Sequence, residues 1–444
     1  MNIIKKMVIS GLTMEARLVL RRHRPFVVAV TGSVGKTATK DAIYDVLTAT
    51  PWQYQAHEMK LIRKSQKSLN SEIGLPLTIL GLNNAWSSPL GWLRNLWLGA
   101  GLIFKGNSYP DCLVLEVGAD HPGDIRRVTR WLKPDVSVIT RVSRTPVHVE
   151  FFDSPAAVLA EKSFLAQAVK ADGALVVYAD DPEYLQFLTD KVKDKPTVKI
   201  YSFGLKAEAA VSAQRIRPVY DPEHKPVGET FDLQLAGQVY PVTLKGTLGQ
   251  VAAYPLLAAA AVAEACQIAP TAYVPTLARY QAPRGRLNII AGLNGSTILD
   301  DTYNASPDAT LAALETLRSL ETTGRKIAVL GDMMELGKYS AEAHRQVGAA
   351  AAGVVHQLIT VGPRAKLVAE AALAQGLSAA AIQSFDSSTE AAPAVAAMVT
   401  AGDIVLVKGS QSPRLERVSK ALLAEPARAA ELLVRQEPEW LQKA

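Results

Sequence analysis

A strand-like run that leads straight into a glycine-containing turn and then a helical pattern stands out near the N-terminus. The segment VAVTGSVGKTATK covers residues 28–40. In a strand–turn–helix unit, backbone N–H groups and the positive end of the helix dipole converge on one point, where phosphate binds. Lys36 would reach the β- and γ-phosphates of a nucleotide, and the Thr37 hydroxyl would ligate Mg²⁺. An ordinary βα turn is the alternative, because Val30 stands where a phosphate loop usually begins with glycine. The nucleotide-binding residues are expected to be Thr31, Gly32, Ser33, Val34, Gly35, Lys36 and Thr37.

The same alternation of short apolar runs and helical patterns continues along the chain. Buried strands are expected at residues 25–32, 112–119, 136–142 and 173–181, with helices at 36–50 and 154–171. Strand–helix alternation predicts a mostly parallel sheet covered by helices on both faces. Residues 196–245 differ, because four runs there are typical of antiparallel strands joined by turns. A long alanine-rich helix follows.

A second α/β series begins near Pro283. Its strands are expected within residues 296–305, 325–333, 356–362 and 403–410. We therefore predict an α/β chain with a central P-loop ATPase domain, whose sheet is mostly parallel, and a C-terminal Rossmann-like domain. The expected boundaries are an N-terminal amphipathic helix over 1–25, the central domain over 26–282 and the C-terminal domain over 283–444.

Charge, cysteine content and hydropathy exclude several classes of protein. The net charge of +6 suits an anionic substrate but does not demand nucleic acid. The two cysteines imply no disulfide framework, so a reducing compartment fits. The most apolar stretch, residues 86–105, is free of charge only over 95–104, whereas a bilayer span takes about 20 residues. We expect a cytoplasmic enzyme with small-molecule partners and no nucleic acid; the oligomeric state is not readable.

The apolar stretch itself has two interpretations. Trp92, Leu93, Leu96 and Trp97 are expected to share one helical stripe. Tryptophan favours membrane interfaces and basic flanks suit an anionic leaflet, which allows peripheral contact with a membrane or a partner. Packing of this insert on the ATPase core is the other interpretation.

Polar residues follow the strands of the central domain. Glu116 ends a buried strand, at the sheet edge where ligands bind in open α/β sheets, and a carboxylate there is a good Mg²⁺ ligand. His148 follows the strand at 136–142, at the same edge. Lys162 lies on a helix whose alanines and leucines indicate burial, which is costly for lysine unless it is paired or modified. A helix cap, a structural histidine and an exposed lysine are the respective alternatives.

The C-terminal half carries a second set of candidates. Arg286 follows the domain boundary, where it could fold across a phosphate. Asp301 and Asn304 lie in a loop placed to contact a ribose or a base, although an Asx-rich turn before the helix start at Ser306 is the alternative. Four further residues in strand-end loops are expected substrate contacts: Asp332, Glu335, Lys408 and Ser410.

From about Val28 to Leu422, the chain resembles the Mur ligase superfamily, most closely its dipeptide-adding branch. The resemblance rests on the ordered motifs TGSVGKT, LNSEIGLPLTIL, LEVGADHPGDI, HVEFFDSPAAVLAEK, RGRL, DDTYNASP, GDMMELG and LVKGS. It implies an ATP- and Mg²⁺-dependent amide ligase. ATP would convert a carboxylate to an acyl phosphate, which an amine then attacks; addition of D-Ala-D-Ala to a peptidoglycan precursor is the expected reaction. The rivals are another Mur-type ligase, acting on folate or poly-amino acids, and a nucleotide-binding module without ligation.

The resemblance also implies roles for individual residues. Lys36, Lys162, His148 and Arg286 match the catalytic set: the phosphate-loop lysine, a lysine carbamylated by CO₂, a ligand of a second Mg²⁺ and a γ-phosphate contact. Thr37 and Glu116 match Mg²⁺ ligands, Asp301 a ribose contact and Asn304 the loop beside the base.

The chain also departs from the family pattern. Before the phosphate loop it has about two dozen residues in place of the usual UDP-binding domain. Val251, Ala252 and Pro255 replace the His-Asn-x-x-Asn residues near adenine, Tyr178 replaces an asparagine, and two extra residues occur around Arg144.

Overall fold

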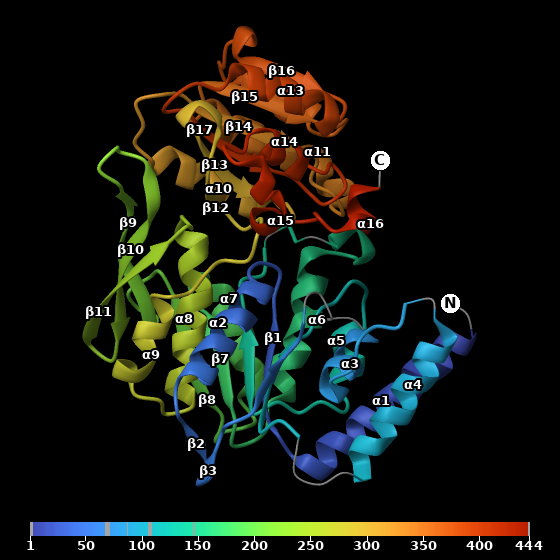
Figure 1. Cartoon of the computed structure of the whole chain (residues 1–444). Coiled ribbons are helices and arrows are strands. Elements are labelled where there is room, and N and C mark those ends of the chain that lie inside the picture. The colour runs from blue at the N-terminus through green and yellow to red at the C-terminus, as the bar shows by residue number, and fades with distance from the viewer. Residues whose placement is uncertain are drawn as a thin grey trace.

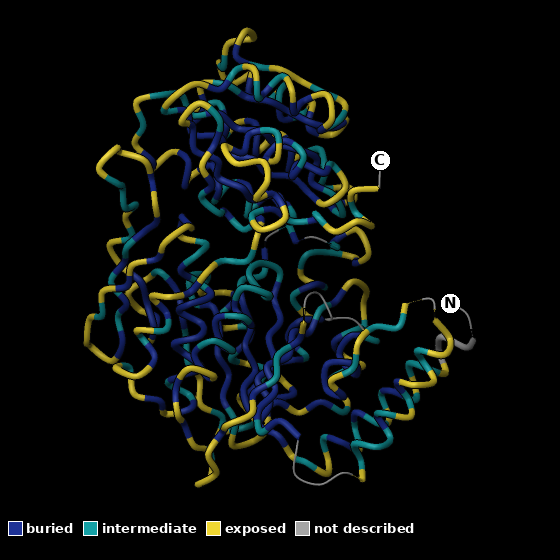
Figure 2. The backbone as a smooth tube through the Cα atoms, in the orientation of Figure 1, coloured by how far each residue is buried: buried dark blue, intermediate teal, exposed yellow. Residues whose placement is uncertain are grey.

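Two α/β domains, with a pair of helices beside the first, make up the chain (Figure 1). The computed structural model describes residues 3–66, 72–86, 88–104, 109–143, 145–146 and 148–442. Arg144 and the first residues of the LNSEIGLPLTIL motif lie outside this part of the chain. Figure 2 shows buried backbone concentrated in the two sheets and their inner helices, and exposed backbone on the outer turns.

The central domain is built on one mixed sheet, which in the described part of the chain has nine strands in the order β11-β10-β9-β8-β7-β6-β1-β5-β4. The strands are β1 Phe26–Thr31, β4 Ile62–Lys64, β5 Cys112–Glu116, β6 Val136–Ile139, β7 Ala174–Tyr178, β8 Lys199–Gly204, β9 Val211–Tyr220, β10 Pro226–Leu235 and β11 Gln238–Lys245. From β4 across the sheet to β9, including β1, neighbouring strands are parallel. The strands β9, β10 and β11 pair antiparallel with one another. The expectation that residues 197–204 are antiparallel is therefore wrong: β8 pairs parallel to both neighbours.

Helices cover both faces of this sheet. The main ones are α2 Lys36–Ala49, α3 Gly74–Leu80, α5 Asp124–Thr129, α6 Pro155–Ala168, α7 Pro182–Thr189, α8 Gln250–Ala265 and α9 Pro270–Leu277. Helices α2, α8 and α9 contact one another, and α5 contacts α6. Local sequence sets their starts: the Ser154 side chain accepts the Ala157 N–H ahead of Pro155, which is a typical N-cap. Most alanines of α8 are buried, and their small side chains let this helix lie close to the sheet.

The C-terminal domain contains a second sheet, whose described strands run in the order β12-β13-β17-β14-β15-β16. They are β12 Asn288–Ala291, β13 Thr297–Asp301, β14 Lys326–Gly331, β15 Gln357–Val361, β16 Ile382–Phe385 and β17 Ile404–Lys408. The predicted strands of this half are confirmed. Among these strands only β12 is antiparallel, and it forms the sheet edge nearest the central domain. Separate cores fill the two faces, beneath α10 Pro307–Ser319, α11 Ser340–Ala352 and α12 Lys366–Ala374 on one side and α13 Ser388–Met398 and α14 Glu416–Ala421 on the other.

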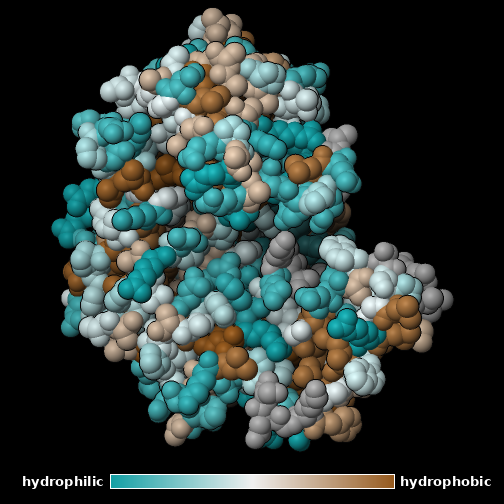
Figure 3. All heavy atoms as spheres, viewed as in Figure 1, coloured by the Kyte–Doolittle hydropathy of each residue, from teal (hydrophilic) through white to brown (hydrophobic). Residues whose placement is uncertain are grey.

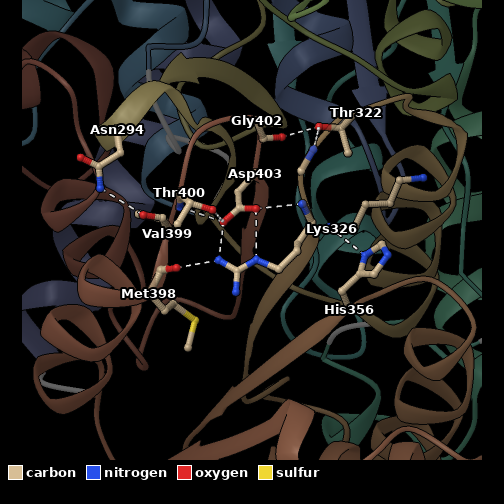
Figure 4. A network of polar contacts seen from close by, with 11 residues as sticks. Asn294, Thr322, Lys326, His356, Met398, Val399, Thr400, Gly402 and Asp403 are labelled. Atoms are coloured by element: carbon tan, nitrogen blue, oxygen red, sulfur yellow. Dashed lines mark hydrogen bonds and ion pairs between the residues drawn. The ribbon is translucent and has the colours of Figure 1, made fainter.

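A buried carboxylate fixes the register of the two central strands of this sheet (Figure 4). Asp403 accepts the backbone N–H of Arg325 at 2.8 Å and its guanidinium at 2.6 Å, and also the N–H of Thr400. These bonds hold the starts of β14 and β17 level, with Lys326 paired to Ile404. The far ends of both strands then reach the same edge, where the predicted substrate loops begin.

The helix pair consists of α1 Ile3–His23 and α4 Pro89–Phe104, which lie side by side and project from the central domain (Figure 1). A Cβ atom on Gly99 would meet the flexible carboxylate end of Glu15, so the two helices lie close together at this point. The predicted common stripe is wrong: Trp92 and Leu96 pack inward, whereas Leu93 and Trp97 face solvent. Within the described residues, no helix is long and apolar enough to cross a bilayer.

Candidate active site between the domains

Many of the predicted site residues line a cavity of about 770 Å³ between the two domains. It lies beyond the carboxyl ends of β1 and β5 on one side and faces the strand-end loops of the C-terminal sheet on the other. Ten predicted residues line it: Ser33, Val34, Lys36, Thr37, Glu116, His148, Arg286, Asn304, Glu335 and Ser410. The chain thus brings residues from both domains to one open space.

The phosphate-loop geometry explains why two of its glycines are needed. A Cβ atom on Gly32 would collide with the Thr140 side chain, and Gly35 has a left-handed φ of 82° at the start of α2. The N–H groups of Ser33 and Val34 donate to the Arg141 carbonyl at 2.9 and 3.1 Å. The loop entrance is therefore held by backbone bonds. Helix α2 begins without a side-chain cap, which leaves its first-turn N–H groups as the anion cradle.

Lys36 is the first residue of α2 and is half-buried at the cavity wall. Burial lowers the pKa of its amine, an effect that the Glu116 and Asp120 carboxylates oppose and that Arg286 from the other domain reinforces. Glu116 ends β5 and is buried, and its Oε2 accepts the Thr37 hydroxyl at 2.9 Å. A lysine, a hydroxyl and a carboxylate thus meet where the phosphate loop ends.

His148 connects the two domains across the cavity. Its Nδ1 lies 3.0 Å from Glu335 of the C-terminal domain, and its Nε2 lies 3.6 Å from Asp120. The close approach of His148 lowers the pKa of the Glu335 carboxyl, although partial burial opposes the shift. Sequence reasoning missed Asp120, although it follows Glu116 in the same strand-end loop. Among the described side chains, no group of three or more His, Cys, Asp and Glu residues is placed to hold a metal ion, so the predicted Mg²⁺ ligands remain a prediction.

Lys162 is buried on α6, which excludes the exposed-lysine alternative. Burial, together with Lys36, lowers the pKa of the Lys162 amine to about 7, although Glu161 and Asp120 act in the opposite direction. The neighbouring Glu161 is used structurally, because its carboxylate accepts the N–H groups of Gly123, Ile125 and Arg126 at the start of α5. A substantial share of the Lys162 amine is therefore uncharged near pH 7, and the amine lies near the phosphate-loop lysine, Lys36.

A small, mostly apolar slot of about 60 Å³ lies beside the phosphate loop. Val251, Ala252 and Pro255 line it, at the positions where the family pattern has polar residues. Asp301 and Lys408 also line it and form a buried ion pair at 2.6 Å. Lys408 thus lines this slot and not the large cavity, and its expected substrate contact stays a prediction.

Of the remaining candidates in the C-terminal domain, some line the cavity and others make hydrogen bonds within the domain. Asp332 does not line the cavity: it is buried and its Oδ1 accepts the Ala365 N–H at 2.8 Å, so its expected substrate contact stays a prediction. Ser410 lines the cavity and accepts the Met334 N–H. Ser306 caps α10, as the turn interpretation predicted, and Asn304 accepts the next backbone N–H while still facing the cavity.

Arg414 is a cavity residue that sequence reasoning did not single out. It is 7% exposed, ion-paired to Glu416, and bonded through Nη2 to the Trp440 carbonyl at 3.1 Å. Glu416 also pairs with Arg435, so two guanidinium groups share one carboxylate. The Nη1 of Arg414 is buried with no hydrogen-bond partner among the described residues. At this wall of the cavity, two guanidinium groups thus share one carboxylate, and one buried N–H group of Arg414 is unpaired among the described residues. No local sequence signal marks Arg414 as a cavity residue: Glu416 is two residues away, but Trp440 is 26 residues away in the chain.

The sequence is similar to two family models and to several characterised ligases. Residues 30–263 match the family described as Mur ligase middle domain, and residues 285–411 match that described as Mur ligase, glutamate ligase domain. The UDP-N-acetylmuramoyl-tripeptide--D-alanyl-D-alanine ligase of Bacillus subtilis is 27% identical over 94% of this chain and 80% of its own length. The Escherichia coli enzyme of that name is 27% identical over 89% of this chain and 76% of its own.

Solved structures of Mur-type ligases and of a folylpolyglutamate synthase have a similar fold. The MurF ligase from Thermotoga maritima in complex with ADP has a TM-score of 0.73 and 25% identity over 93% of this chain and 83% of its own. Folylpolyglutamate synthase from Mycobacterium tuberculosis, complexed with ADP, shares the fold, with a TM-score of 0.61 and 18% identity over 91% of this chain and 92% of its own.

Proposed function

The chain belongs to the Mur ligase family and is an ATP-dependent ligase, and we propose that it joins D-Ala-D-Ala to the peptide carboxylate of a peptidoglycan precursor. The observation that carries this proposal is the interdomain cavity. One wall ends in the phosphate loop, and the opposite wall presents Arg286 and Arg414. The names of the B. subtilis and E. coli relatives support the choice of substrates.

The proposed reaction transfers the γ-phosphoryl group of ATP to the substrate carboxylate, which forms an acyl phosphate and ADP. The amine then attacks the acyl carbon, and the tetrahedral intermediate collapses to the amide with loss of phosphate. Lys36 and Arg286 approach the phosphoryl group from the two domains and stabilise the charge that develops on it. Fixed cations of this kind do most of the catalytic work in phosphoryl transfer.

The residues at the phosphate end fit a magnesium ion. Thr37 and Glu116, whose side-chain oxygens lie 2.9 Å apart, would hold it, because oxygen is the donor that Mg²⁺ prefers. When bound, the ion neutralises phosphate charge. We propose that Lys162 becomes a carbamate by adding CO₂ to its neutral amine and releasing a proton. The low pKa that burial gives Lys162 keeps that amine available.

The remaining pockets suit the rest of the substrates. The apolar slot beside the phosphate loop would hold the base against Pro255, with Asp301 at the ribose. Because the slot offers mostly apolar contacts, the base would be held by stacking and shape. The free carboxylate of D-Ala-D-Ala would bind the unpartnered Nη1 of Arg414, because a charged carboxylate is the natural partner of a buried guanidinium.

Phosphate release tests the proposal. The enzyme should release phosphate from ATP only when a tripeptide precursor and D-Ala-D-Ala are both present, whereas a mere binding module would show no such dependence. Folate with glutamate serves as the rival substrate pair. Turnover with that pair alone would replace the proposed substrates with folate-type ones.

Lys36→Ala should reduce phosphate release by about 10²- to 10³-fold, the usual cost of removing a preorganised charge stabiliser. Its thermal unfolding temperature should stay close to that of the wild type, since Lys36 is only half-buried. Wild-type turnover by this variant would remove Lys36 from the proposed mechanism.

A further inference from the structure

The projecting helix pair presents an apolar face that nothing in the described chain covers. On α4, Leu90, Leu93, Trp97 and Phe104 are 63–82% exposed. Their spacings of three, four and seven residues place them along one side of the helix. Trp86, just before α4, is 81% exposed. A row of large apolar side chains in solvent is typical of an interaction surface.

Helix α1 adds a second exposed stripe. Met7, Met14 and Leu18 face solvent, and one turn later the same side of the helix reaches Arg21. Figure 3 shows hydrophobic residues gathered over the region of α1 and α4. The opposite sides of the two helices pack together, through Leu12 and Ala16 of α1 among others. Each helix is therefore apolar on its inner side and on its outer side.

The charges around this face are almost all of one sign. Arg17, Arg21 and Arg22 on α1 and Arg94 on α4 are cationic, and Glu15 is the single acidic residue in the two helices. Glu15 lies inward, over Gly99, and burial raises the pKa of its carboxyl to about 7. The outer face therefore presents apolar and cationic side chains together.

A basic cleft lies at the C-terminal end of α1. Its volume is about 460 Å³. Six cationic side chains line it: Arg17, Arg21, Arg24, Arg130, Lys133 and Lys170. Trp131 lies among them, and of the described residues that line the cleft, none is acidic. Lys170 is ion-paired with Asp135 at 2.7 Å, so its charge is partly compensated. The cleft shares Arg17 and Arg21 with α1, which makes it continuous with the exposed stripe of that helix.

We propose that this face, consisting of the outer stripes of α1 and α4 and the basic cleft, docks the enzyme on a membrane surface that carries anionic phospholipids. The tryptophans and leucines enter the boundary between headgroups and acyl chains, and the cleft holds lipid phosphates. A second copy of this chain is a poorer occupant, because a symmetric contact would bring two basic faces together. The helices lie on the surface rather than cross it, in keeping with their length and charge.

Docking in this way leaves the active site open. The cleft includes Pro25 and Val27, at the start of β1, whereas the phosphate loop follows the other end of that strand. The two sites therefore lie at opposite ends of the central sheet. Surface variants of the docking face should retain the rate of phosphate release in solution, which separates this inference from the proposed function.

Vesicle flotation tests the inference. The full chain is mixed at low salt with phosphatidylcholine vesicles that contain about 30% phosphatidylglycerol, a density at which basic residues contribute measurably. The protein should float with these vesicles, and binding should fall at least about tenfold on pure phosphatidylcholine or at about 0.5 M salt. Leu93→Ser/Trp97→Ser and Arg21→Glu/Arg130→Glu should each weaken binding at least about tenfold. Both variants alter exposed side chains, so the fold should persist.

Matched controls come from exposed positions of the C-terminal domain. Leu373→Ser removes an apolar side chain that is 51% exposed, and Arg345→Glu/Lys420→Glu reverses two exposed charges. Both should bind vesicles like the wild type. Failure of the wild type to float at low salt, or binding that neither test variant weakens, would overturn the inference. So would a concentration-dependent dimer, measured by sedimentation velocity, that Leu93→Ser/Trp97→Ser abolishes while vesicle binding is absent.

Discussion

At the scale of single residues, Arg414 offers the sharpest test of how the amine substrate is held. Arg414→Met should raise the KM for D-Ala-D-Ala by about 10- to 150-fold, the loss of one charged hydrogen bond, and leave the KM for ATP unchanged. The variant should fold, because Glu416 keeps Arg435 as its partner. A dipeptide with an amidated C-terminus should be a poor substrate for the wild type and nearly equal to D-Ala-D-Ala for the variant.

The control is Arg435→Met, which removes a guanidinium bonded to the carbonyls of Thr302 and Tyr303. It should lower stability without a selective change in the KM for the dipeptide. If Arg414→Met changes the KM for ATP and for the dipeptide alike, the carboxylate role is wrong.

Lys36, Thr37 and Glu116 could be found from the sequence, because each sits at a fixed place in a strand–loop motif. Arg414 and Asp120 could not, since their importance depends on side chains that only the fold brings near.

At the scale of elements, the buried carboxyl of Asp300 makes the stability of β13 depend on pH. The pKa of Asp300 is raised to about 7: burial is the main cause, the hydroxyls of Ser419 and Thr302 oppose the rise, and Asp301 and Glu416 add to it. The folded state thus holds a proton that the unfolded chain releases near pH 4. The stabilising contribution is full below that pH and is lost as the pH rises through about 7.

Asp300→Asn should therefore flatten the fall in unfolding free energy between about pH 4 and pH 7, as measured by urea unfolding at several pH values. At pH 8 the variant should be at least as stable as the wild type, because it buries no charge. An unchanged slope would show that Asp300 does not titrate in this range. Asp386→Asn, an exposed carboxylate, is the matched control.

The same scale shows where sequence patterns stop. Apolar runs predict buried strands well, as β1, β5 and β14 show, because burial on both faces leaves a continuous hydrophobic signature. They do not predict direction: β8 is parallel to its neighbours although the strands after it form hairpins. Likewise, α4 is apolar on two sides, so its sequence cannot show which side packs on α1.

At the scale of the whole molecule, polar bridges hold the two domains around the cavity. His148 meets Glu335 at 3.0 Å, and Arg141 meets Asp308 at 3.5 Å. Each bridge joins the central domain to the C-terminal domain. The sequence could place these residues in strand-end loops, but their pairing depends on the relative orientation of the domains. Polar contacts of this kind hold a geometry more weakly than a shared apolar core, so domain motion is expected.

Breaking both bridges should broaden the distance between the domains. Dyes on Lys193→Cys and Glu370→Cys would report it by single-molecule energy transfer, because both positions are exposed and lie in different domains. The native Cys112 and Cys266 are buried, so they should not react with the dyes. In Glu335→Gln/Asp308→Asn, the distribution of transfer efficiencies should widen and shift to lower values, since the cavity walls are no longer held together. Dyes on Lys193→Cys and Glu223→Cys, both in the central domain, should show no change. An interdomain distribution as narrow as that of the wild type would mean that other contacts fix the cavity, and that the site is rigid before any substrate binds.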